Sequence, residues 1–154
     1  TVSPQWQVPD SDLNGWLMLA STVLLTAGTL WLHQLIKRLR AGMHHGLMGQ
    51  LAVLAIVAFV QSALLLWLML SAGLAPTETA HDAVIFVMLA YNLIHCTLAA
   101  VLTGLQAWRV ALGYVGDKAP YEPIVVEQLW YYNLGVLWVS YAAIVLFPAT
   151  WGGA

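Results

Sequence analysis

The stretch "YNLIHCTLAAVLTGLQAW", residues 91–108, decides the fold class of this chain. It is apolar over most of its length, and about 20 such residues form an α-helix that crosses roughly 30 Å of hydrocarbon. Asn92 and His95 nevertheless lie near its middle. Polar groups at that depth are costly, so they mark either a functional site or a contact between helices.

The composition of the whole chain agrees with a membrane location. Of its 154 residues, 61% are hydrophobic and 8% are charged, whereas about 25% of the residues in a soluble domain are charged. The net charge of −2 is too small to indicate binding to nucleic acid. The sequence therefore predicts an integral membrane protein.

Apolar segments recur four times along the chain, at residues 16–36, 47–74, 84–108 and 124–147. Each is long enough to span a bilayer as a tilted helix. We therefore predict an all-α, integral membrane four-helix bundle that forms a single transmembrane domain over residues 1–154. Because lipid is as apolar as leucine, small residues such as Gly28 and Gly135 are expected to let helices approach one another.

Basic residues are confined to the first and third connections between these segments, while the second connection and the N-terminal segment contain none. The positive-inside rule then places both termini on the outer, periplasmic side and the two basic loops in the cytoplasm. The predicted anchors at the cytoplasmic face are Lys37, Arg38, Arg40, Arg109 and Lys118.

Five histidines raise the question of heme binding. Ligation by two histidines needs both imidazoles at a common depth. His95 precedes Arg109 by 14 residues, which places it roughly 21 Å from the cytoplasmic end of its helix. His33 lies roughly 6 Å from the same side. The difference in depth argues against a heme ligated by this chain.

A metal site formed by His33 with His44 and His45 is a second possibility. We expect no carboxylate or thiolate nearby to complete such a site, and the spacing does not match a compact zinc motif. Interfacial imidazoles beside lipid headgroups are the simpler interpretation. Glu127, at the entrance of the last segment, is expected to remain in contact with water.

Catalytic and nucleotide-binding motifs are absent from the sequence. We therefore expect no catalytic, cofactor-binding or metal-binding residue in this chain. Asn92 and His95 are instead spaced at i and i+3, on one face of a helix, where they are expected to bond to a neighbouring helix through Gln61 or Asn133. The predicted polar contacts between helices are Gln61, Asn92, His95 and Asn133.

Four segments, taken in order, match the motifs of one family. "STVLLTAGTLWLHQLIK" is similar to a Ser/Thr-rich "NTxLLxxSG" helix, and the matching residues are Ser21, Thr22, Leu24, Leu25 and Gly28. "FVQSALLLW" is similar to a helix with the pattern "FxxxQxxEY", in which Gln61 matches and Leu64 and Leu65 replace the acidic and aromatic pair.

The last two segments continue the match. In "GLAPTETAHDAVIFVMLAYNLIHCTLAAVLTG", His95 falls on the second histidine of "GxHxxHVxxG", and Asn92 stands at the first. "VVEQLWYYNLGVLWVSYAAIVLF" is similar to "WYWHFVD": Trp130 and Tyr131 match, whereas the substituted positions are Tyr132, Asn133 and Val136. In this order the segments resemble the last four helices of cytochrome c oxidase subunit III.

This resemblance implies an accessory, non-catalytic domain of a respiratory heme–copper oxidase in a bacterial inner membrane. Such a domain packs on the catalytic subunit, binds lipid and supports proton uptake and stable turnover, while heme and copper reside in the partner subunit. "GLAPTETAH" looks most like oxidases in which subunit III is fused behind subunit I, which would account for a chain that starts at Thr1. The alternatives are a small membrane-anchor or b-type cytochrome subunit of a respiratory complex, and a transporter fragment.

Overall fold

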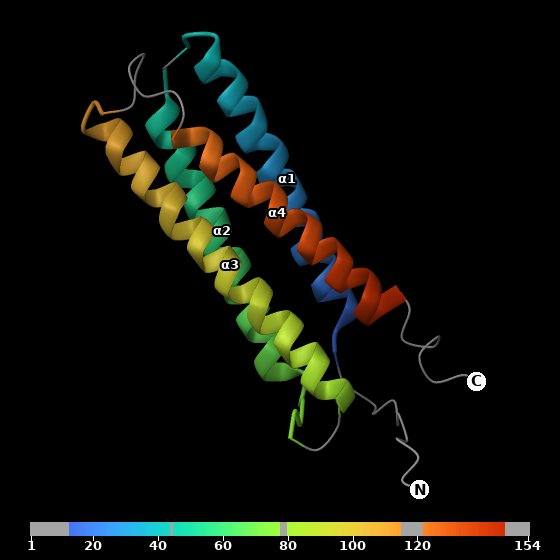
Figure 1. Cartoon of the computed structure of the whole chain (residues 1–154). Coiled ribbons are helices and arrows are strands. Elements are labelled where there is room, and N and C mark those ends of the chain that lie inside the picture. The colour runs from blue at the N-terminus through green and yellow to red at the C-terminus, as the bar shows by residue number, and fades with distance from the viewer. Residues whose placement is uncertain (1–12, 44, 78–79, 115–121, 147–154) are drawn as a thin grey trace, which may run out of the picture.

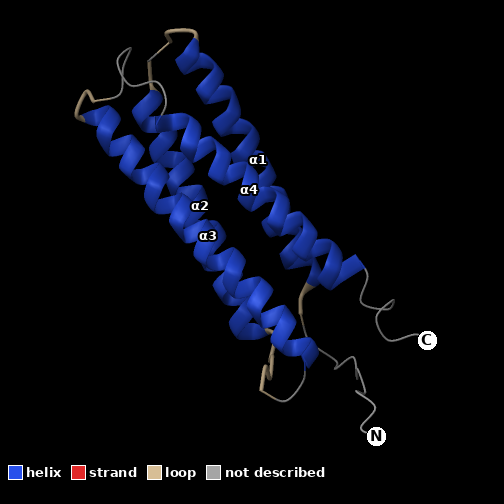
Figure 2. Cartoon of the chain, viewed as in Figure 1, coloured by secondary structure: helices blue, strands red, loops and turns tan. Residues whose placement is uncertain are grey.

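Four long helices make up the protein in the computed structural model, which describes residues 13–43, 45–77, 80–114 and 122–146. The helices are α1 (Gly15–Arg40), α2 (Leu47–Ser71), α3 (Ala80–Ala111) and α4 (Glu122–Tyr141), and a π-helical turn, η1 (Ala142–Leu146), continues α4 (Figure 1). All four helices are long and apolar enough to cross a membrane. Within the described ranges the chain contains no strand (Figure 2). The predicted all-helical fold with four spans is confirmed.

Helix bounds differ from the predicted spans mainly at the polar ends. The span predicted at 16–36 continues to Arg40, and the one predicted at 84–108 runs over Ala80–Ala111. Hydropathy marks only the apolar part of a helix, whereas backbone hydrogen bonding continues through charged residues near the membrane surface.

The ends of α1 and α3 follow known capping patterns. At the start of α1, the Asn14 side chain accepts a hydrogen bond from the amide of Leu17 at 3.1 Å, which satisfies one of the free amides of the first turn. At its end, the amides of Gly42 and Met43 donate to carbonyls of the last turn, with Gly42 at a φ of 76°. The same pattern at Gly113 ends α3, so glycine in the left-handed conformation stops both helices at the same end of the bundle.

Each helix packs against two others, α1 and α3 both lying between α2 and α4. The most extensive contact is between α2 and α3, and Figure 1 shows α1 beside α4. We use "basic end" for the end of the bundle where α1 and α3 terminate, since Lys37, Arg38, Arg40 and Arg109 occupy their last turns. Cations there also interact favourably with the C-terminal ends of the helix dipoles.

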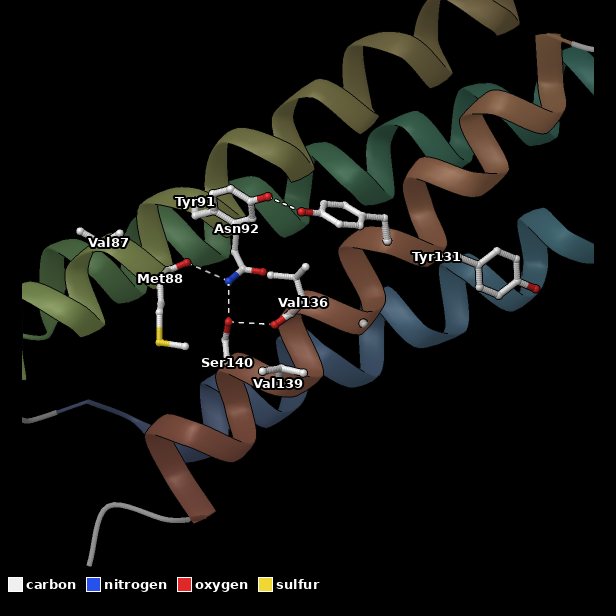
Figure 3. Close-up of a pocket in the computed structure, with 10 residues that line it drawn as sticks. Val87, Met88, Tyr91, Asn92, Tyr131, Val136, Val139 and Ser140 are labelled. Carbon is white, nitrogen blue, oxygen red and sulfur yellow. Dashed lines mark hydrogen bonds between the residues drawn. The ribbon is translucent and has the colours of Figure 1, made fainter. Parts of the chain in front are cut away.

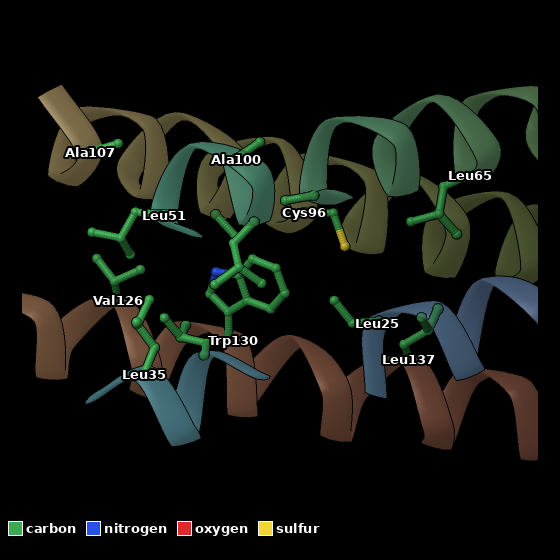
Figure 4. Close-up of a cluster of buried hydrophobic side chains, with 14 of the residues drawn as sticks. Leu25, Leu35, Leu51, Leu65, Cys96, Ala100, Ala107, Val126, Trp130 and Leu137 are labelled. Carbon is green, nitrogen blue, oxygen red and sulfur yellow. The ribbon is translucent and has the colours of Figure 1, made fainter. Parts of the chain in front are cut away.

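The core runs along the axis of the bundle, and its largest fully buried side chain is Trp130 (Figure 4). The outer surface is also apolar, since Phe59, Trp67 and Leu70 are each more than 60% exposed. This distribution suits helices surrounded by hydrocarbon. Buried hydroxyl groups donate to carbonyls four residues earlier in the same helix, at Thr22, Thr29, Ser62 and Thr103.

Candidate functional site

Hydrogen bonds between buried side chains join the helices in pairs. Between α1 and α2, the amide nitrogen of Gln61 donates to the hydroxyl of Ser21 at 2.5 Å, and both residues are fully buried. Gln61 is one of the residues predicted to make polar contacts between helices, and its bond to Ser21 lies between α1 and α2. Its partner was not foreseen, because a serine near the start of an apolar span carries no signal that distinguishes it from its neighbours.

Asn92 joins α3 to α4 (Figure 3). Its amide nitrogen donates to the carbonyl of Met88 and to the hydroxyl of Ser140, both at 2.8 Å. Ser140 in turn donates to the carbonyl of Val136 at 2.8 Å. The bond of Asn92 between helices goes to Ser140 and not to Gln61 or Asn133.

His95 contacts α4 in two ways. Its backbone carbonyl accepts a hydrogen bond from the amide nitrogen of Asn133 at 3.1 Å. Its imidazole Nδ1 is 2.9 Å from the carbonyl of Tyr91 on the same helix, and its ring packs against Tyr91 and Tyr132, with centroids 4.0 and 5.7 Å away. The hydroxyl groups of these two tyrosines also bond to each other across the interface. The side chain therefore belongs to an aromatic cluster, while the interhelical hydrogen bond uses the backbone.

Two tryptophans of α4 form further contacts that the sequence did not indicate. The indole nitrogen of Trp130 donates to Thr103 on α3 at 3.0 Å, and that of Trp138 donates to Thr26 on α1 at 3.2 Å. The only sequence signal for such pairs is a threonine within one apolar span and a tryptophan within another. The signal is weak, because a threonine hydroxyl can also be satisfied by its own helix.

Glu127 occupies a different environment from the one predicted. Its carboxylate is 2.6 Å from Nδ1 of His33 and 3.7 Å from the guanidinium of Arg40, and its side chain is only 9% exposed. The expectation that Glu127 stays in contact with water is wrong, and so is the expectation that His33 has no carboxylate nearby. The cause is the antiparallel packing of α1 and α4, which brings the end of one helix to the start of the other.

The histidines and basic residues of the two predicted cytoplasmic loops are exposed wherever the structure describes them. His45 is exposed at the basic end, and His44 and Lys118 lie outside the described residues. Lys37, Arg38, Arg40 and Arg109 are all exposed in the last turns of α1 and α3. Among the described residues, no three His, Cys, Asp or Glu side chains come together in a group that could hold a metal ion.

Taken together, the fold and these contacts define an all-helical membrane domain with four spans, held together by polar pairs between its helices. No protein-family model, curated protein or solved structure matches the chain.

Proposed function

We propose that this chain is an accessory, non-catalytic domain of a respiratory heme–copper oxidase, similar to the last four helices of subunit III. In this role it packs on the catalytic subunit and supports proton uptake and stable turnover. Heme and copper belong to the partner subunit. The resemblance of four motifs in sequence order is the starting point of the proposal.

One observation carries it further: the residues on which the resemblance rests meet one another in space. Ser21 of the first motif bonds to Gln61 of the second. A second contact joins the last two motifs, where Asn133 bonds to the backbone of His95. The matched residues therefore lie at the interfaces between helices, as expected if the motifs describe helix packing.

The first and last motifs also meet, through Gly28 and Trp130. A Cβ atom at position 28 would lie 2.7 Å from the Trp130 ring, so only glycine leaves room for this fully buried indole. All four motifs are thus linked by contacts at matched or corresponding positions. This supports the interpretation that the four motifs together describe one way of packing four helices.

The apolar outer surface is consistent with a partner subunit in the membrane. Side chains such as Phe59, Trp67 and Leu70 are available to lipid or to another helix. A partner that covers part of this surface needs shape complementarity and few polar groups. We propose the bacterial inner membrane as the location, with the basic end in the cytoplasm and both termini in the periplasm.

Affinity purification tests the proposal directly. The tagged chain is extracted from its native membranes in mild detergent, and its companions are identified by mass spectrometry and by a reduced-minus-oxidised spectrum. We expect a heme-containing subunit to co-purify. Gly28→Leu, which cannot accommodate Trp130, should reduce that co-purification. Gly49→Leu is the matched control, because a Cβ at position 49 meets nothing within 4 Å.

Two results would contradict the proposal. A monodisperse chain that purifies without any companion would contradict the proposal that it belongs to an oxidase. A b-type heme spectrum from the chain alone would favour the alternative, a small cytochrome or membrane-anchor subunit.

Cysteine labelling tests the proposed orientation. Single cysteines placed near Arg40 and Lys118 should react with a membrane-impermeant reagent only from the cytoplasmic side, and one near Thr79 only from the periplasmic side. The reason is the confinement of all basic residues to two loops. Labelling of the Arg40 and Lys118 sites from opposite sides would overturn the topology.

A further inference from the structure

A cavity of about 530 Å³ lies between α3 and α4 (Figure 3). Its volume falls within the range of roughly 300–1,000 Å³ that is usual for small-molecule sites. Gly135 contributes to the cavity by having no side chain, because a Cβ at this position would meet no atom within 4 Å. The space is therefore bounded by side chains of the two helices and is not filled by either of them.

The cavity is placed within the membrane. Asn92, which lines it, is 12 residues after the first residue of α3 and 19 before the last. These separations correspond to about 18 and 28 Å along the helix axis. A molecule that enters the cavity must therefore arrive through the hydrocarbon layer, which requires a lipid-soluble ligand.

An unpartnered acceptor faces this space. Asn92 is 2% exposed. Its amide nitrogen faces two oxygens, the Met88 carbonyl and the Ser140 hydroxyl. Both must accept, because the proton of the Ser140 hydroxyl is donated to the carbonyl of Val136. The amide orientation is thus fixed. Its oxygen points away from these partners toward α4 (Figure 3), and no described residue donates a hydrogen bond to it. This oxygen is accessible from the cavity, where it can accept a hydrogen bond from a bound ligand.

The aromatic lining adds a donor and a preference for flat rings. The rings of Tyr91 and Tyr132 line the cavity, whereas the ring of Tyr131, another lining residue, is turned toward His33 on α1 (Figure 3). Tyr91 and Tyr132 share one hydrogen bond between their hydroxyl groups, and the hydroxyl that accepts in this bond keeps its own proton for a ligand. Aromatic rings also pack favourably against other aromatic rings.

From these features we propose that the cavity binds the phenolic head of a lipid-soluble quinol. One quinol hydroxyl donates to the amide oxygen of Asn92, and a quinol oxygen accepts from the tyrosine pair. The ring lies against Tyr91 and Tyr132, and the apolar tail leaves toward the hydrocarbon. An acyl chain of a phospholipid fits less well, since it has no donor and would leave the Asn92 oxygen unsatisfied.

Binding of decylubiquinol to the protein, purified in mild detergent with its companions, tests this site. The sample is kept anaerobic and treated with cyanide, so that the quinol is not consumed. We expect Gly135→Leu, which fills the cavity, to weaken one saturable site at least tenfold, and Asn92→Leu to weaken the same site. Gly49→Leu should bind like the wild-type protein.

The chemistry is tested with the wild-type protein alone, so the result does not depend on whether a variant folds. The bis-O-methyl ether of decylubiquinol has the same ring but no hydroxyl donor, and we expect it to bind at least tenfold more weakly. Equal binding of the ether and the quinol would overturn the proposal, as would equal binding to wild-type protein and Gly135→Leu. A phospholipid that co-purifies with wild-type protein, is lost from Gly135→Leu and resists displacement by decylubiquinol would also overturn it and assign the cavity to an acyl chain.

Discussion

Gly28 and Gly135 are both interior helical glycines, yet their surroundings differ completely. Beside Gly28 the Trp130 ring would come within 2.7 Å of an added Cβ, and Val57 would lie at 3.4 Å. Beside Gly135 an added Cβ would meet nothing, because this glycine borders the cavity between α3 and α4. One glycine therefore permits close packing between helices, and the other leaves space.

The difference shows how a membrane bundle distributes its packing. Lipid tails compete with side chains for apolar contacts, so tight association depends on local fit and on hydrogen bonds. Around Trp130 both are present, since the indole is fully buried and bonds to Thr103. Near Gly135 the helices are joined by the Asn92–Ser140 hydrogen bond while a cavity remains beside it.

The largest effect is expected from Gly28→Leu. The new side chain would overlap a rigid, fully buried ring, and overpacking of this kind costs about 3 kcal/mol of unfolding free energy. Titration with SDS in mixed micelles measures the change. Gly135→Leu is the matched control and should stay close to wild type. Similar losses in both variants would show that the two glycines do not differ as described.

A somewhat smaller effect is expected from Glu127→Leu, which removes the buried carboxylate that joins α4 to His33 and Arg40. Hydrogen bonds to charged groups contribute about 2 kcal/mol, so the SDS midpoint should fall accordingly. Glu127→Gln keeps a hydrogen-bonding group of the same shape and should lose about half as much. A Leu variant as stable as wild type would indicate that the ion pair contributes nothing to packing.

Asn92→Leu should have a modest effect. Hydrogen bonds between membrane helices contribute about 0.6 kcal/mol on average, and this variant loses the bond to Ser140. His95→Leu removes an aromatic contact but leaves the backbone bond from Asn133 in place. The two side chains have separate partners, so we expect their effects to add. A coupling energy above about 0.5 kcal/mol in the double variant would show that these neighbours share one network.

The same pair of variants separates packing from heme ligation. Heme difference spectra of the whole complex should be unchanged in His95→Leu, since its ring packs against the rings of Tyr91 and Tyr132. Loss of one heme per complex in this variant alone would show that His95 is an iron ligand.

The smallest effect is expected from Gly135→Ala, and its sign is opposite to that of the others. Alanine favours the helix over glycine by up to about 1 kcal/mol, and the added methyl group has room. The SDS midpoint should rise slightly. A clear fall would mean that the space beside residue 135 is occupied, for example by a bound lipid that the methyl group displaces.

Part of the polar network was predictable because of where its residues stand. Gln61, Asn92 and Asn133 are amides inside apolar spans, and an amide in hydrocarbon must find a partner. Their partners could not be predicted, because the partner depends on the rotation and vertical offset of each helix. Ser140, rather than Gln61, receives the bond from Asn92 for this reason.

The partner of Glu127 at the basic end could not be predicted either. From the sequence it stands at a helix entrance, where a carboxylate can be hydrated. His33 is 94 residues away along the chain, so no local pattern links the two. The ion pair results from the antiparallel arrangement of α1 and α4 and the burial of that part of their interface.

The sequence by itself determined the four spans, because the length and apolarity of a segment suffice to place a helix across a bilayer. It also determined which polar residues would lie inside them. Only the tertiary structure decided which of those residues meet, which of the two glycines is closely packed and where a cavity remains. These features depend on how each helix is rotated and displaced against its neighbours. The rotation and displacement of each helix are set by the fit of many side chains at once. Neither the hydrophobic period nor the composition of a single segment encodes them.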